Sequence, residues 1–179
     1  SLKEVPQRSK GEKFNGSWQA FAMNDYVLRY SDIMLMRAEA LIELDRLAEA
    51  RTIINDIRQR AKNSVDKHID YAKAQCDIAL YPESYFQDKE TARKCLRWER
   101  RLEMAMENGR FFDLRRWGIA SETLNRYFAS EQNDKYGEQT YAQYLKDAKF
   151  TPGKNEFYPV PYNQLYYIPG LYKQNKGYE

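Results

Sequence analysis

The chain has 179 residues, of which 42% are hydrophobic and 31% charged, which is the composition of a globular protein long enough for one domain with a real core. The net charge is only +3, with 29 basic and 26 acidic residues mixed along the chain, and this balance argues against general nucleic-acid binding. No apolar run is long enough to predict a transmembrane helix, and the first residues lack the apolar core of a signal peptide, so they read as the middle of a longer protein.

Cysteine and histidine usage predicts neither a metal site nor a bound cofactor. The two cysteines, Cys76 and Cys95, fit no metal-ligand spacing and are too few for a disulfide framework. Each is expected to pack as a small apolar side chain, and a disulfide between them is the alternative. The single histidine, His68, lies among polar neighbours and is expected at the surface.

Hydrophobic periodicity predicts a helical hairpin early in the chain. Residues 1–24 carry Gly and Pro breakers and are expected to form an extended entry segment. From about residue 25 to 44 a helical stripe includes Val27, Tyr30, Met34, Ala38 and Leu41, is widened by Leu28, Leu35 and Ile42, and has Asn24 or Asp25 as the cap. A second stripe over 46–62 is formed by Leu47, Ala50, Ile54, Ile57 and Ala61. The short break between them requires antiparallel packing, as in a tetratricopeptide hairpin.

Further helices are expected over roughly 69–80 and over 88–109. The second of these would bury a face formed by Cys95, Trp98, Leu102, Ala105 and Met106, and would end at Asn108-Gly109 because both residues tolerate left-handed backbone. Another helical stretch follows Gly118, and the tail from residue 158 has low helix propensity.

These elements predict an all-α fold, with tetratricopeptide-like helical hairpins and a long, loop-rich, Tyr-rich carboxy-terminal arm. Residues 25–126 form the helical scaffold, and residues 127–179, with ten of the fifteen tyrosines, form an arm packed on it. We expect all parts to belong to one domain.

The segment ENGRFFDLRRWG, residues 107–118, gathers three arginines and three aromatic rings around one aspartate. It is interpreted as a structural joint in which Arg110 or Arg115 folds back onto Glu99 and Glu103, which share one helix face. An anion site is the alternative, but the nearby acids would neutralise the cations internally. The complete predicted joint consists of Glu99, Glu103, Arg110, Asp113, Arg115, Arg116 and Trp117.

Four segments, taken together and in this order, resemble the carboxy-terminal part of the RagB/SusD family. They are RYSDIMLMRAEALIEL with AEARTIINDIRQRA, then ERRLEMAMENGRFFDLRRWG, then NEFYPVPYNQL, and finally QNKGY. The family pattern has a YPIP element and a QNPGY end, so Val160 in place of Ile is a mild departure.

The resemblance implies a binding protein rather than an enzyme. Family members are nutrient-binding outer-membrane lipoproteins of Bacteroidetes, held at the extracellular face by a lipidated amino-terminal cysteine. They lie over a SusC-like, TonB-dependent barrel and hand it glycans or peptides. They are considerably longer than this chain, and no lipidation cysteine is visible, so the resemblance implies a carboxy-terminal fragment whose missing part holds much of the ligand site.

Ligand residues are expected on loops, because the aromatic residues of the scaffold are committed to packing. Sugar binding uses flat aromatic faces beside polar groups, and the loop candidates are Trp18, Tyr81, Tyr85 and Phe86. Ordinary packing of these loops against the scaffold is the alternative for each of them.

Two other classes of function are alternatives to glycan binding. A tetratricopeptide-type scaffold would take a peptide or a protein in the groove between the first two helices. A glycosidase would need one carboxyl group with a raised pKa, whereas the arginines beside Glu99 and Glu103 should lower the pKa of both. The sequence therefore predicts no catalytic residue, and it does not identify the ligand.

Overall fold

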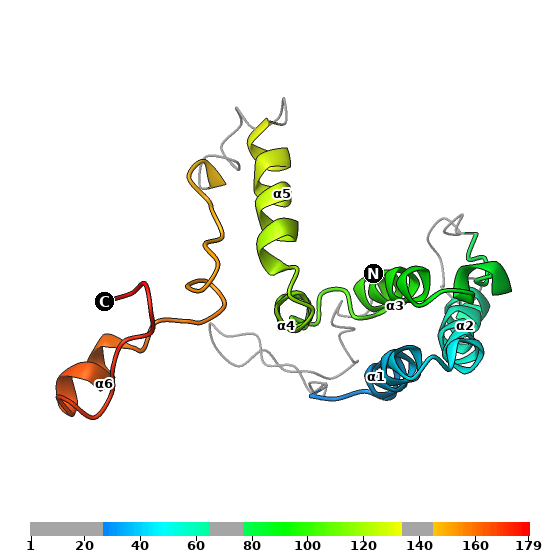
Figure 1. Ribbon diagram of the computed structural model, residues 1–179, viewed down its shortest axis with the longest axis horizontal. Helices are drawn as coiled ribbons and strands as arrows, with labels where there is room; N and C mark the ends of the chain where they lie inside the picture. The colour runs from blue at the N-terminus through cyan, green and yellow to red at the C-terminus, as the bar shows by residue number, and fades with distance from the viewer. Residues whose placement is uncertain (1–26, 65–76, 134–144) are drawn as a thin grey trace, which may run out of the picture. The chain divides into compact units, whose positions relative to one another are not determined.

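The computed structural model describes residues 27–64, 77–133 and 145–179, and these residues form helices and loops with no strand among them (Figure 1). The helices are α1 Tyr30–Glu43, α2 Leu47–Ser64, α3 Lys89–Glu103, α4 Arg110–Arg116, α5 Ala120–Asn133 and α6 Tyr162–Tyr167, with a short 3-10 helix η2 at Glu83–Phe86. The predicted all-α fold is confirmed.

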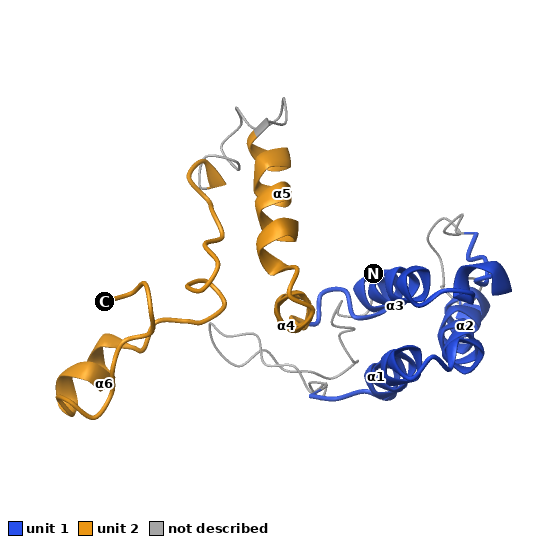
Figure 2. Cartoon of the chain, viewed as in Figure 1, with its two compact units in different colours: residues 1–107 blue, residues 108–179 orange. Residues whose placement is uncertain are grey.

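Two compact units divide the chain, residues 1–107 and residues 108–179 (Figure 2). The predicted entry segment, residues 1–24, lies outside the described residues. The predicted arm, residues 127–179, begins inside α5 of the second unit, and its packing on the scaffold stays a prediction.

The first unit is built on the predicted hairpin of α1 and α2. Asp45 joins the two helices with a left-handed backbone (φ 59°), and the N–H of Arg46 donates to the carbonyl of Leu41 at 2.9 Å. This bond closes the end of α1, so the chain reverses within three residues, Leu44–Arg46. The short connection is what places the two helices side by side.

The stripe predicted for α2 is confirmed, whereas the one predicted for α1 is partly wrong. Ala50, Ile54 and Ile57 are buried on α2. On α1 the helix begins at Tyr30, and Val27 and Tyr30 are exposed. The buried face follows positions that differ by four and three, and it consists of Ser31, Leu35, Ala38, Leu41 and Ile42.

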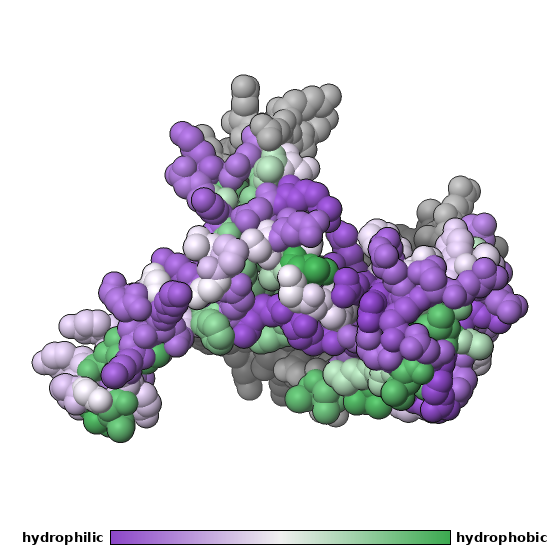
Figure 3. Space-filling model, in the orientation of Figure 1, coloured by the Kyte–Doolittle hydropathy of each residue, from purple (hydrophilic) through white to green (hydrophobic). Residues whose placement is uncertain are grey.

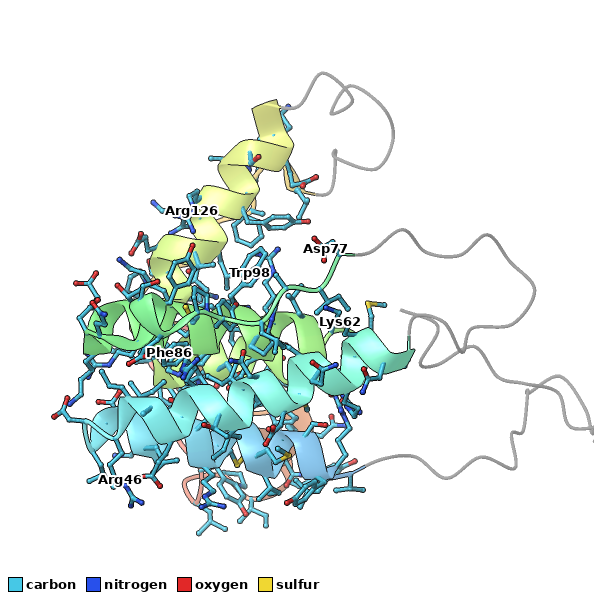
Figure 4. All side chains as sticks on the ribbon, turned by 90° about the vertical axis from the view of Figure 1, so that its right-hand side faces the viewer. Arg46, Lys62, Asp77, Phe86, Trp98 and Arg126 are labelled. Atoms are coloured by element: carbon cyan, nitrogen blue, oxygen red, sulfur yellow. The ribbon has the colours of Figure 1, made fainter. Side chains whose placement is uncertain are left out.

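The helix predicted over 88–109 ends earlier, and of its predicted buried face only Cys95 is buried. α3 ends at Glu103, and Met106 and Asn108 both adopt left-handed backbone (φ 67° and 59°). Trp98 and Leu102 are about half exposed, and Trp98 lies on the side of α3 away from α1 and α2 (Figure 4). The buried residues are Ala92, Cys95, Leu96, Glu99, Arg100 and Glu103.

Two other expectations about helices are corrected by the structure. Residues 77–82 have no helix, so the part of the 69–80 helix that lies in the described residues is wrong. The tail contains α6, because Pro161 presets the backbone at the position before its first residue. His68 and Cys76 lie outside the described residues, and Cys95 has a free, buried thiol.

Candidate functional site

The aromatic segment before α3 is fastened to α2 by a side-chain amide. Asn55 on α2 accepts from the backbone N–H of Tyr81 at 2.8 Å and donates through Nδ2 to the Tyr81 carbonyl at 3.0 Å. The Arg58 guanidinium lies 4.5 Å from the centre of the Tyr81 ring and donates to the Ala79 carbonyl at 2.7 Å. These contacts hold the segment in a fixed position against α2.

The candidate ligand residues of this segment have three different environments. Phe86 is buried in the core of the first unit, between α2 and α3 in Figure 4, so its ring anchors the segment to that core. Tyr81 is half-buried, and its ring lies 6.1 Å from those of both Tyr85 and Phe86. Tyr85 is about half exposed, so it can offer a ring face to a ligand. Trp18 lies outside the described residues.

Burial raises the pKa of Tyr81 to about 12, although the nearby Arg58 opposes the shift. The hydroxyl therefore stays neutral at physiological pH and keeps both a donor and an acceptor. Together, Tyr81 and Tyr85 form a small aromatic surface with a neutral hydroxyl, which is a chemistry suited to a sugar.

Charged side chains on α3 are buried in pairs with side chains from α1 and α2. Glu99 accepts from Arg58 at 2.7 Å, and Arg100 donates to Asp32 at 2.9 Å. Glu103 binds Arg29 at 2.6 Å and also Arg60. Arg29 reaches Glu107 as well, at 2.7 Å. Each carboxylate is matched by a guanidinium, which is what allows these charges to be buried.

The expectation that arginines lower the pKa of Glu99 is wrong. Burial raises the pKa of Glu99 more than the contact with Arg58 lowers it, and the charge of Glu103 raises it further. The side chain is nevertheless only 5% exposed and bonded to Arg58, so a raised pKa does not by itself offer an acid to a substrate.

The residues of the predicted joint are divided between the two units. Glu99 and Glu103 belong to the first, where arginines of the α1–α2 region bind them. In the second unit Arg116 pairs with Asp113 at 3.0 Å and lies over the Trp117 ring. Arg110 also faces Trp117, and Arg115 lies 5.1 Å from the Phe157 ring. Pairing of Arg110 or Arg115 with the acids of α3 stays a prediction.

The tail of the second unit carries an exposed aromatic surface on α6 that the sequence reasoning did not nominate. Its tyrosines lie in a loop whose two ends are held together by Gln174 and Asn175. A signal was present in the sequence, because the stretch from Phe157 to Tyr172 contains no charged residue in a chain that is 31% charged.

Comparison with known proteins gives a family for most of the chain. The family model described as the SusD family matches residues 8–178. No curated protein sequence matches the chain. In the described part of the chain, no helix has the length and apolarity needed to cross a membrane.

Proposed function

Because the chain belongs to the SusD family, we propose that it binds a glycan nutrient at the cell surface and delivers it to a TonB-dependent outer-membrane transporter. Membership of this family, over residues 8–178, is the observation that carries the proposal, since it supports nutrient binding as the general activity. The barrel partner, the outer-membrane location and a lipid anchor outside this chain follow from the same resemblance and are part of the proposal.

The proposed contact in the first unit is the surface of Tyr81 and Tyr85, with Trp18 as a further candidate. Tyr85 would stack on the apolar face of a sugar, and the Tyr81 hydroxyl would exchange hydrogen bonds with sugar hydroxyl groups. Asn55 and Phe86 would hold this surface in place, so that little ordering entropy is lost on binding. Each contact is weak, and avidity would come from several sugar units along a polymer.

The proposal includes no catalytic step. Glu99 and Glu103 are the two acids on α3 that the sequence offers as a catalytic pair, and both are buried and bonded to arginines. A general acid must reach the glycosidic oxygen, and these side chains are committed to packing between helices.

A second candidate function is a protein-interaction scaffold of the tetratricopeptide type, or a peptide-binding role within the same family. The α1–α2 hairpin favours it, since α1 exposes an apolar surface that includes Tyr30, Ile33 and Met36. Figure 3 shows hydrophobic surface over this part of the first unit. Surfaces of this kind mark sites of contact with other chains.

Affinity electrophoresis of the chain against a panel of soluble polysaccharides tests the proposal. Tyr85→Ala should weaken the affinity for the retarding polysaccharide about tenfold, which corresponds to about 1.4 kcal/mol of binding free energy. Tyr30→Ala removes an exposed tyrosine from the same unit and should leave glycan retardation unchanged. Trp18→Ala is measured in the same assay, and a lower affinity of this variant would support Trp18 as a further contact.

If no polysaccharide retards the chain, glycan binding is rejected for it. Binding of a peptide panel that is lost in Tyr30→Ala would then establish the interaction scaffold instead. Retardation that survives Tyr85→Ala would keep glycan binding and reject Tyr85 as a contact.

A further inference from the structure

The loop between the two carboxy-terminal family motifs has a composition unlike the rest of the chain. The family-like segment NEFYPVPYNQL ends at Leu165 and QNKGY begins at Gln174, so only residues 166–173 of the loop lie outside both segments. From Phe157 to Tyr172 there is no Asp, Glu, Lys or Arg.

Side chains of the QNKGY motif bind the backbone of residues 157–160 and so hold the two ends of this loop together. Gln174 accepts from the Val160 N–H at 2.7 Å and donates to the Val160 carbonyl at 3.1 Å. Asn175 donates to the Tyr158 carbonyl at 2.6 Å, and the Tyr178 hydroxyl donates to the Phe157 carbonyl at 3.2 Å. A loop closed in this way keeps its aromatic residues in place before any ligand arrives, which reduces the entropic cost of binding.

The tyrosines of α6 point into solvent instead of into a core. Tyr162, Tyr166 and Tyr167 are 75%, 66% and 74% exposed. α6 has no buried residue, and Figure 3 shows hydrophobic surface around it. A group of this kind on a folded segment indicates a binding surface rather than packing.

The geometry of the rings suits the flat face of a sugar. Tyr162 and Tyr166 lie one helical turn apart, with ring centres 6.1 Å apart and planes only 20° from parallel. Tyr167 packs edge-on against Tyr166, at 5.8 Å and 72°. The near-parallel pair offers two neighbouring faces of similar orientation, and the exposed amides of Asn163 and Gln164 supply donors and acceptors beside them.

We infer that the α6 loop is a second carbohydrate-contact surface, on which an uncharged polysaccharide chain stacks across Tyr162 and Tyr166. This inference rests on the proposed glycan binding and adds the substrate class. A polyanion would find no cation between Phe157 and Tyr172 with which to pair, so the composition of the loop favours a neutral polymer over an acidic one. Exposed rings on an open surface suit a long polymer better than a small ligand, which requires a concave pocket.

A protein partner is the competing occupant. Ile168 and Leu171, which are 49% and 63% exposed, would suit it. The near-parallel tyrosine pair and its flanking amides favour the polysaccharide, since aliphatic side chains add little to contact with a hydroxylated polymer.

The test compares the full chain with the double variant Tyr162→Ala/Tyr166→Ala against neutral and acidic soluble polysaccharides. Neutral dextran, xyloglucan and galactan are used beside polygalacturonate and dextran sulfate. The double variant should lose at least about tenfold in affinity for the neutral polymer that the chain binds. Tyr127→Ala removes a half-exposed tyrosine from α5 in the same unit and should change affinity less than twofold.

A third variant, Tyr162→Phe/Tyr166→Phe, keeps the rings and should retain most of the affinity. Circular dichroism checks that each variant folds, which is expected because neither ring is buried.

Each other outcome overturns the inference in a recognisable way. Binding that is equal in the double variant rejects the α6 surface but leaves the proposed function standing. Absence of polysaccharide binding by the unmodified chain rejects both. A preference for the acidic polymers rejects the neutral class. Concentration-dependent self-association that disappears in the double variant, without any polysaccharide effect, makes the loop a protein contact.

Discussion

At the scale of single residues, Glu99 shows how a buried ion pair couples stability to pH. Burial raises its pKa above the ordinary value of 4.5, despite the contact with Arg58. The folded state therefore holds the proton more tightly than the unfolded state. The stability that this proton provides is fully present below pH 4.5 and is lost as the pH rises through the folded pKa of Glu99.

Glu99→Gln should remove this pH dependence. The free energy of unfolding of the unmodified chain, relative to the variant, should fall as the pH rises from 4.5 toward 7, because only the carboxylate must be buried as a charge. Urea unfolding at several pH values measures the difference between the two proteins. The opposite slope would mean that Arg58 outweighs burial and that the pKa of Glu99 is lowered.

The residue scale is also where sequence reasoning about the site was weakest. Phe86 and Tyr85 were nominated together, yet one is in the core and the other at the surface. Neighbours in a 3-10 helix point in different directions, and which direction is inward depends on α2 and α3, which lie elsewhere in the sequence. The partners of Glu99 and Glu103 were missed for the same reason.

At the scale of elements, the start of α3 depends on one capping side chain. Asp88 precedes the helix, and its carboxylate accepts from the Thr91 N–H at 2.8 Å. That backbone hydrogen bond lowers the pKa of Asp88, so the cap acts in its charged form.

Asp88→Ala should lower the free energy of unfolding, because the first turn of α3 loses a partner for its N–H groups. Asp56→Ala, at an exposed position inside α2, serves as the matched control and should leave stability unchanged or slightly higher. Chemical denaturation at neutral pH gives both values. Equal effects of the two substitutions would show that the cap contributes nothing.

Helices with several regularly spaced apolar positions could be predicted, including α3, but the buried charged face of α3 and the short helix α6 could not. The stripe of α2 was correct because Ala50, Ile54 and Ile57 follow one helical face. α3 buries Glu99, Arg100 and Glu103, which a hydrophobicity pattern assigns to solvent. α6 was missed because the tail has low helix propensity, although a proline such as Pro161 is compatible with the start of a helix.

At the scale of the whole molecule, the two units differ in how much core they contain. In the first unit α1, α2, η2 and α3 contribute to one buried cluster that includes Leu35, Ile42, Ile54 and Leu96. Among the described residues of the second unit, the buried cluster consists of Leu114, Ala120 and Phe150. Backbone amides are better protected from hydrogen exchange where buried apolar contacts oppose local opening of the structure.

Backbone amides of α1–α3 should therefore exchange with solvent more slowly than those of α5. Ile54→Ala should cost about 3 kcal/mol and should reduce protection throughout α1–α3. Hydrogen exchange followed by mass spectrometry gives the protection of each helix. Protection of α5 equal to that of α3 would contradict the expected difference.

Side-chain amides hold loop segments in both units, with the same pair of bonds. Asn55 binds the N–H and the carbonyl of Tyr81, and Asn125 binds those of Phe150. Gln174 does the same for Val160. Only an amide offers a donor and an acceptor side by side, so conversion to an acid removes the donor and turns an anionic oxygen toward a carbonyl. Substitution of Asn55 by Asp would thus loosen the Tyr81 segment while every buried apolar residue of the first unit stays in place.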